Sequence, residues 1–219
     1  LCRAVFGPFN LNSIGEERFT ALWAEITAFL GEKGQCAALC AGAAGVSNPM
    51  VQTLTAQAME RAGISNWRMA GDHEIALHGA LSGQPGCALI AGTGSICCGR
   101  NARGEFVRVG GWGHLIDDGG SGYALGRDAL AAVVRQWDGR GEKTVLSELV
   151  PAKLGIKTPQ ELVAYAYGGD KSRIAAAAPL VEQAAGLGDR IALRIYGRAG
   201  MELSALAAAA ANRLGLENG

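Results

Sequence analysis

Blocks of apolar residues separated by polar turns predict alternating strands and helices over the first part of the chain. Short strands are expected at 1–6, 36–41 and 67–70, the second of them covered on both faces. Apolar side chains at helical spacing predict a helix after each strand, the first capped by Ser13 and the second ended by Gly63. This alternation favours an α/β layer with parallel strands.

The pattern changes after residue 86. Tight turns join three short apolar segments, which predict an antiparallel meander with strands at 87–91, 96–99 and 106–109. The remainder is predicted to be helical, with helices near 121–137, 172–185 and 189–214. The turn at 82–86 lies between the two patterns, so we expect two domains, 1–84 and 85–219.

Composition and charge narrow the class of protein. Apolar residues make up 49% of the chain and charged residues 18%, which is typical of a well-packed globular protein. The net charge is zero and Lys and Arg form no run, which argues against nucleic acid or an anionic membrane surface as a partner. No apolar run approaches the roughly 20 residues that cross a bilayer, and no signal-peptide pattern is found.

The six cysteines show no zinc-site spacing, so we expect no protein-held metal. Cys36, Cys40 and Cys87 lie in apolar segments and are predicted to be buried, reduced thiols. Reduced thiols indicate a reducing compartment, and a cytoplasmic location is therefore expected.

The stretch from 87 to 130 contains eleven glycines and is the main candidate for binding chemistry. The turn Gly92-Thr93-Gly94-Ser95 lies between two predicted strands, where glycines let backbone amides face a phosphate and the hydroxyls add donors. An ordinary hairpin turn is the alternative interpretation.

Two better-known phosphate motifs are incomplete. The segment Gly168-Gly169-Asp170-Lys171-Ser172 resembles the end of a P-loop, but Asp170 stands where a glycine must precede the lysine. The glycines at 120, 122 and 126 are spaced one residue too far for a dinucleotide fingerprint.

A second glycine-rich segment, 110–122, has the residues of a sugar site. Trp112 stands between Gly111 and Gly113, so its ring could offer a face to a sugar, and the carboxylates of Asp117 and Asp118 could accept sugar hydroxyls. A helix starting at 121 would also point its positive end toward this site. The alternatives are a Trp112 that fills the core and an Asp118 that caps the helix.

Asp72 is the candidate general base. It follows a predicted strand and precedes a helix, which is where ligand sites of α/β proteins lie. A structural role as a helix N-cap is the alternative.

Taken together, ALIAGTGS at 88–95, GGWGHLIDDGGSGYALGRDAL at 110–130 and Gly71-Asp72 resemble the N-acetylglucosamine kinases of the BadF/BadG/BcrA/BcrD ATPase family, in the actin and hexokinase superfamily. The similarity extends over essentially the whole chain. It implies two RNase-H-like, actin-like ATPase domains that close over Mg²⁺-ATP and sugar, with helices at the C-terminal end, in a cytoplasmic homodimer.

The resemblance also implies roles for individual residues. Asp72 would take the proton from the sugar 6-hydroxyl. The turn Gly92-Thr93-Gly94-Ser95 would hold the ATP phosphates, and Ala175 would line the adenine pocket. The sugar would be held by the residues Asn10, Gly111, Trp112, Gly113 and Asp118.

The sequence departs from the family in two respects. Relatives often carry Asp-Glu-Gly-Ser where this chain has Asp118-Gly119-Gly120-Ser121, so one acidic group is absent. The first phosphate hairpin, Asp-Gly-Gly-Gly-Thr, and the final Gly-Gly adenosine segment are not found. We therefore expect a sequence truncated at both ends, whose 219 residues alone bind ATP poorly and do not turn over.

Three functions follow as hypotheses. The first is ATP-dependent phosphorylation of an amino sugar, most of all N-acetylglucosamine to its 6-phosphate. The second is an ATPase that activates an acyl-CoA dehydratase or reductase, which needs cysteine thiolates for a shared iron–sulfur cluster. The third is a sugar-sensing module without catalysis. Cys97 and Cys98 are adjacent and should face opposite sides of a strand, which favours the first hypothesis over the second.

Overall fold

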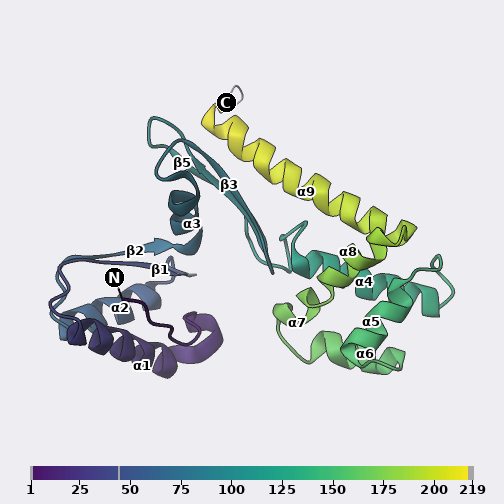
Figure 1. Ribbon diagram of the computed structural model, residues 1–219, viewed down its shortest axis with the longest axis horizontal. Helices are drawn as coiled ribbons and strands as arrows, with labels where there is room; N and C mark the ends of the chain where they lie inside the picture. Colours follow the sequence, from purple (N-terminus) through teal and green to yellow (C-terminus); the bar gives the residue numbers. More distant parts are fainter. Residues whose placement is uncertain (1, 44, 217–219) are drawn as a thin grey trace. The chain divides into compact units, whose positions relative to one another are not determined.

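The computed structural model describes residues 2–43 and 45–216, and it is an α/β structure of two compact units (Figure 1). Unit 1 comprises residues 1–79 and unit 2 residues 80–219. No helix in the described part of the chain combines the length and apolarity needed to span a membrane.

Unit 1 is built on two parallel strands, as the alternating pattern predicts. Strand β1 (Leu39–Ala43) pairs with β2 (Trp67–Gly71) in parallel register, with Ala41 opposite Met69. The helices are α1 (Leu11–Glu32), α2 (Pro49–Arg61) and the beginning of α3 (Asp72–Leu81). Parallel pairing requires the crossover that α2 provides.

An aromatic cluster forms the core of unit 1. The rings of Phe9 and Phe19 stack at 4.6 Å, and Phe9 meets Trp23 edge-on at 5.0 Å. Trp23 is buried and its indole N–H donates to the Thr55 hydroxyl of α2 at 3.1 Å. A buried Trp N–H needs such a partner, so this bond fixes α1 against α2.

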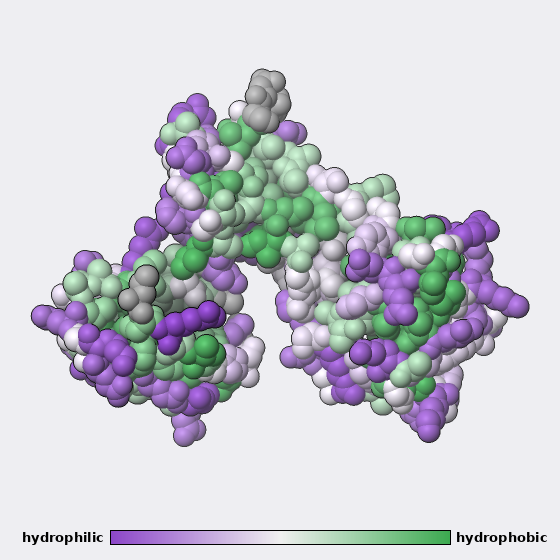
Figure 2. Space-filling view, viewed as in Figure 1, coloured by the Kyte–Doolittle hydropathy of each residue, from purple (hydrophilic) through white to green (hydrophobic). Residues whose placement is uncertain are grey.

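Unit 2 contains a three-stranded antiparallel sheet in the order β3-β4-β5, as predicted. The strands are β3 (Gly86–Ala91), β4 (Ser95–Arg100) and β5 (Phe106–Gly110). The long helix α9 (Arg190–Leu214) contacts all three strands. Figure 2 shows apolar surface, in green, over this sheet.

The other helices of unit 2 gather around α4 (Gly122–Trp137). They are α5 (Leu146–Leu154), α6 (Pro159–Tyr167), α7 (Lys171–Ala175) and α8 (Ala178–Gly186). Helix α6 is capped by Thr158, whose hydroxyl accepts from the Glu161 amide at 3.2 Å. Val133, Val150 and Val181 are fully buried and join α4, α5 and α8 in one core.

Several expectations about local structure are wrong. Residues 2–6 form no strand, because no described strand pairs with them; residue 1 lies outside the described residues. The helix expected to start at Ser13 begins at Leu11 and is broken at Gly15, whose φ is +76°. The helix expected at 172–185 is two helices, α7 and α8. Pro179, in the first turn of α8, lacks the amide that a continuous helix would need.

The prediction of a doubly covered strand at 36–41 is also wrong. The strand begins three residues later, at Leu39, and burial alternates along it, so that the face carrying Cys40 and Gly42 is exposed. Cys40 is exposed, and Cys36 and Cys87 are half-buried, whereas Cys97 and Cys98 are the buried thiols. The apolar run of small residues at 36–41 therefore did not indicate that its cysteines are buried.

Gly126 allows α7 to approach α4, and we predict that Gly126→Ala destabilises the protein. A Cβ at this position would lie inside van der Waals contact with the Ile174 carbonyl. Overpacking of this kind costs about 1–3 kcal/mol, to be measured as the free energy of unfolding in urea. The control is Gly197→Ala on α9, where an added Cβ meets nothing within 4 Å and should stabilise by about 0.5–1 kcal/mol. Equal effects of the two substitutions would contradict the packing argument.

Candidate active site

The turn between β3 and β4 is hydrogen-bonded to the first residues of α4. Ala91 pairs with Ser95, so Gly92, Thr93 and Gly94 form the connection. The Gly122 amide donates to the Gly92 carbonyl at 2.7 Å, and the Tyr123 amide donates to the Thr93 carbonyl at 3.2 Å. We call residues 92–95 the phosphate turn, after the role expected for them.

These bonds change the expected use of the α4 N-terminus. Its first amides are occupied by the carbonyls of the phosphate turn, so they hold the turn in place and are not available for a ligand. By contrast, the amides of Thr93 and Gly94 make no hydrogen bond within the described part of the chain. With the carbonyls bound by α4, two successive amides are left for an anion.

A buried carboxylate supports the other side of the turn. Asp118 is 3% exposed, and its Oδ1 accepts from the Ser95 amide at 3.3 Å. The Ser95 hydroxyl donates to the neighbouring Gly119 carbonyl at 2.7 Å. Asp118 has a φ of +61°, which a short polar side chain tolerates better than most and which indicates a constrained position.

Oδ2 of Asp118 is buried and has no hydrogen-bond partner among residues 2–43 and 45–216. It forms an ion pair with Lys171, at the start of α7, whose Nζ lies 3.7 Å from this oxygen. Buried carboxylates need such compensation, so Lys171 is a residue of this site. The sequence pattern did not predict it, because Lys171 and Asp118 are far apart in the chain.

The loop that carries Trp112 is braced separately. The Trp112 amide donates to Oδ2 of Asp117 at 3.2 Å, while the amides of Ile116 and Asp117 donate to the Gly113 carbonyl. Gly111 has a φ of +72°, and a Cβ there would meet Ile96 at 2.9 Å. These restraints explain why glycines flank the tryptophan.

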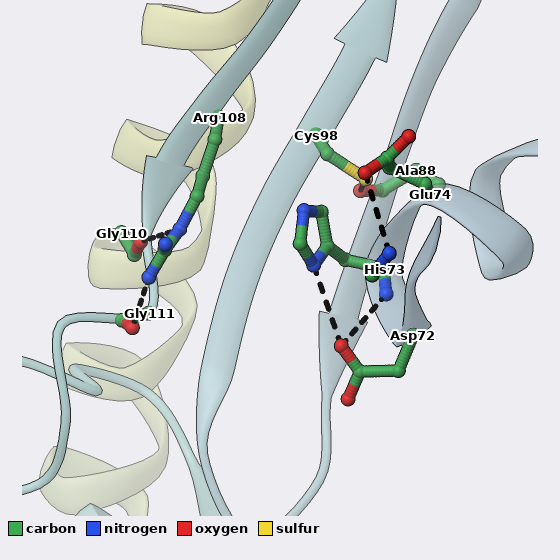
Figure 3. Close-up of polar contacts among 9 residues, drawn as sticks. Asp72, His73, Glu74, Ala88, Cys98, Arg108, Gly110 and Gly111 are labelled. Carbon is green, nitrogen blue, oxygen red and sulfur yellow. Dashed lines mark hydrogen bonds and ion pairs between the residues drawn. The ribbon is translucent and has the colours of Figure 1, made fainter. Parts of the chain in front are cut away.

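Trp112 is 65% exposed and therefore does not fill the core. The Arg108 guanidinium lies over its ring at 4.6 Å and donates to the carbonyls of Gly110 and Gly111, as Figure 3 shows for the two carbonyls. Arg108 fixes the exposed ring as a platform, and sequence reasoning did not predict this role.

Ala175, expected near the adenine, is half-buried on α7. Its Cβ is 3.5 Å from the position that a Cβ added at Gly122 would occupy. Gly122 is the residue whose amide binds the Gly92 carbonyl. The structure thus brings Ala175 and the phosphate turn to the same end of α4.

Asp72 and Asn10 belong to unit 1. Asp72 begins α3, its side chain is 65% exposed, and its Oδ1 accepts from the His73 amide at 2.9 Å (Figure 3). An N-cap would instead accept from an amide two or three residues further on. Asn10 precedes α1, and its carbonyl accepts from the Ser13 amide at 2.9 Å.

Comparison with known proteins identifies the family. The chain belongs to the BadF/BadG/BcrA/BcrD ATPase family, whose model matches residues 1–219. It is 36% identical over 220 residues to the N-acetylmuramic acid/N-acetylglucosamine kinase of Clostridium acetobutylicum, covering 97% of this chain and 72% of that protein. It is 35% identical over 156 residues to the N-acetyl-D-glucosamine kinase of Dictyostelium discoideum, covering 69% of this chain and 49% of that protein.

The fold is similar to that of a solved member of this group. A crystal structure from Chromobacterium violaceum, provisionally designated an N-acetylglucosamine kinase, superposes with a TM-score of 0.73 at 29% identity. The match covers 90% of this chain and 70% of that one. The resemblance inferred from the sequence motifs is thereby confirmed.

Gly94 separates the phosphate turn from Asp118, and we predict that Gly94→Ala lowers the stability of unit 2. A Cβ there would lie 2.9 Å from the Asp118 carboxylate, which is buried and cannot easily move. We expect a loss of about 1–3 kcal/mol in the free energy of unfolding. Gly92→Ala is the control, because an added Cβ meets nothing within 4 Å. An unfolding free energy of Gly94→Ala equal to that of Gly92→Ala would show that the turn yields freely.

Proposed function

We propose that the protein is an ATP-dependent kinase that transfers the γ-phosphoryl group to an amino sugar, N-acetylglucosamine being the expected substrate. One structural observation carries this proposal: the amides of Thr93 and Gly94 have no partner in the described part of the chain, while the carbonyls of Gly92 and Thr93 are held by α4. The kinase activity named for the two curated relatives supports it from comparison.

Each expected residue has a task in phosphoryl transfer, a reaction that depends on positioning and electrostatics. The phosphate turn binds ATP phosphates through its free amides, and Ala175 borders the adenine. Trp112, with Gly111 and Gly113, supports the sugar ring, and Asn10 contributes from unit 1. Asp118 is proposed to hold the sugar with these residues, and its other task is to fix the phosphate turn through the Ser95 amide.

Asp72 is the proposed base. Its carboxylate is exposed, so it can accept the proton of the sugar 6-hydroxyl as the oxygen attacks the γ-phosphorus. His73 contacts the same carboxylate oxygen, with its Nδ1 at 3.3 Å, and limits the orientations of Asp72.

Mg²⁺ would enter with the nucleotide. Among residues 2–43 and 45–216 no group of three or more His, Cys, Asp or Glu side chains could hold a metal ion. Mg²⁺ is commonly held by one or two carboxylates together with substrate phosphates, which fits a site without its own metal cage.

The buried cysteines disfavour the alternative ATPase function. Burial, together with the neighbouring thiols of Cys87 and Cys98, raises the pKa of Cys97 to about 11. A cluster ligand must be a thiolate, whereas this thiol stays protonated at neutral pH. Cys97 also packs against Ala210 and Leu214 of α9, so it is not presented to a partner subunit.

Sugar-dependent release of ADP by the full-length protein is the direct test. We expect ADP release only when N-acetylglucosamine is present, and mass spectrometry should detect the sugar 6-phosphate. Sugar-independent ATPase activity with a brown protein would instead indicate the activator function. Thermal stabilisation by sugar without ADP release would indicate a sensor.

Asp72→Asn should reduce turnover about 10²–10⁴-fold in the full-length protein while the Kd for sugar changes less than about threefold. The amide keeps the shape of the side chain but cannot accept the proton. Steady-state kinetics and calorimetry measure the two effects. Glu60→Gln, which neutralises an exposed carboxylate on α2 of the same unit, is the control and should leave turnover unchanged. Turnover retained in Asp72→Asn would remove Asp72 from the role of base.

A further inference from the structure

The segment Gly168-Gly169-Asp170-Lys171-Ser172 resembles a P-loop ending but does not form one. It leads into α7, and Asp170 caps that helix by accepting from the Ser172 amide at 3.0 Å. The hydrogen bond from the Ser172 hydroxyl holds the pKa of Asp170 below its usual value, so this carboxylate is ionised and occupied by the cap. Lys171, the next residue, does not take part in the cap and pairs with Asp118 instead.

Lys171 reaches the site through Asp118. Its Nζ is 3.7 Å from Asp118 Oδ2, and the other oxygen of that carboxylate accepts from the Ser95 amide at 3.3 Å. One carboxylate therefore separates the ammonium from the backbone of the phosphate turn. Gly94 of the turn also lies directly against this carboxylate, since a Cβ added there would be 2.9 Å from Asp118 Oδ2.

The ammonium has capacity for a further partner. The Lys171 side chain is 42% exposed, and its separation from Asp118 is too long for a hydrogen bond. An ammonium carries three donors. The buried Asp118, in contrast, brings negative charge close to a turn that should bind polyphosphate, so a cation beside it is required.

The rest of α7 is placed to serve the same ligand. Ala175 follows Lys171 by four residues and so lies on the same side of the helix. Ala175 approaches Gly122 at the start of α4, and the Gly122 amide holds the Gly92 carbonyl. Gly126 lets the α7 backbone come this close.

We propose that Lys171 binds the nucleotide phosphates at the phosphate turn, and that Asp118 holds its ammonium there before the nucleotide arrives. The inference rests on the proposed function, because it assumes that residues 92–95 receive ATP. It adds a side-chain cation from α7 to a turn whose other anion donors are backbone amides.

The test compares ligands that differ only in their phosphates. Using the full-length protein and calorimetry, we expect Lys171→Met to raise the Kd of the non-hydrolysable analogue AMP-PNP at least tenfold. The Kd of adenosine should change less than twofold. Lys171→Arg, which keeps the charge, should retain most of the AMP-PNP affinity. Lys153→Met, which removes an exposed lysine of α5, is the matched control and should behave as wild type.

Two outcomes would overturn the proposal. One is an unchanged Kd of AMP-PNP in Lys171→Met. The other is an equal loss of AMP-PNP and adenosine affinity, because that pattern means that the substitution has disturbed α7. Circular dichroism establishes that each variant is folded, and Lys171→Gln replaces Lys171→Met if the latter is not.

Kinetics separate the failure of this proposal from the failure of the proposed function. Wild-type protein without sugar-dependent ADP release would refute the kinase, whatever Lys171 does. Where wild type is active, Lys171→Met should raise KM for ATP at least tenfold and KM for sugar less than threefold. Unchanged KM for ATP in an active variant would refute the role of Lys171 alone.

Discussion

The hydrogen bonds that fix the phosphate turn are the constraint on which the candidate site depends. Two amides of α4 hold its carbonyls, and the buried Asp118 holds the Ser95 amide. A loop with three small or flexible residues would otherwise sample many conformations, at a cost in entropy each time a ligand binds. Because these bonds are formed without ligand, the free amides of Thr93 and Gly94 are preorganised.

The sequence was sufficient to predict those parts of the fold whose signals are local. The helices expected near 121–137 and 189–214 were predictable from their apolar spacing, and the three-stranded meander from the spacing of its turns. Parallel pairing of β1 with β2 also followed from the alternation of strand and helix. Each of these elements has a start, a stop and a period within a short window.

The errors concern properties set by distant contacts. The apolar run at 36–41 could not reveal that one face of the strand is left exposed, and Cys40 lies on that face. The roles of Arg108 and Lys171 depend on residues that the fold brings near them, Trp112 in one case and Asp118 in the other. The candidate residues in the glycine-rich segments were predictable from composition and motif resemblance. The side chains that hold them in position, Arg108 and Lys171, were not.

Asp117 and Asp118 are neighbours that brace different loops: the first binds the Trp112 amide and the second the Ser95 amide. Their single shared peptide bond couples the position of the aromatic platform to that of the phosphate turn. An insertion or deletion near this pair would put one carboxylate out of register with its loop. Loop exchanges in this region should therefore place their junctions before Gly111 and before Asp117, so that the pair and its spacing stay intact.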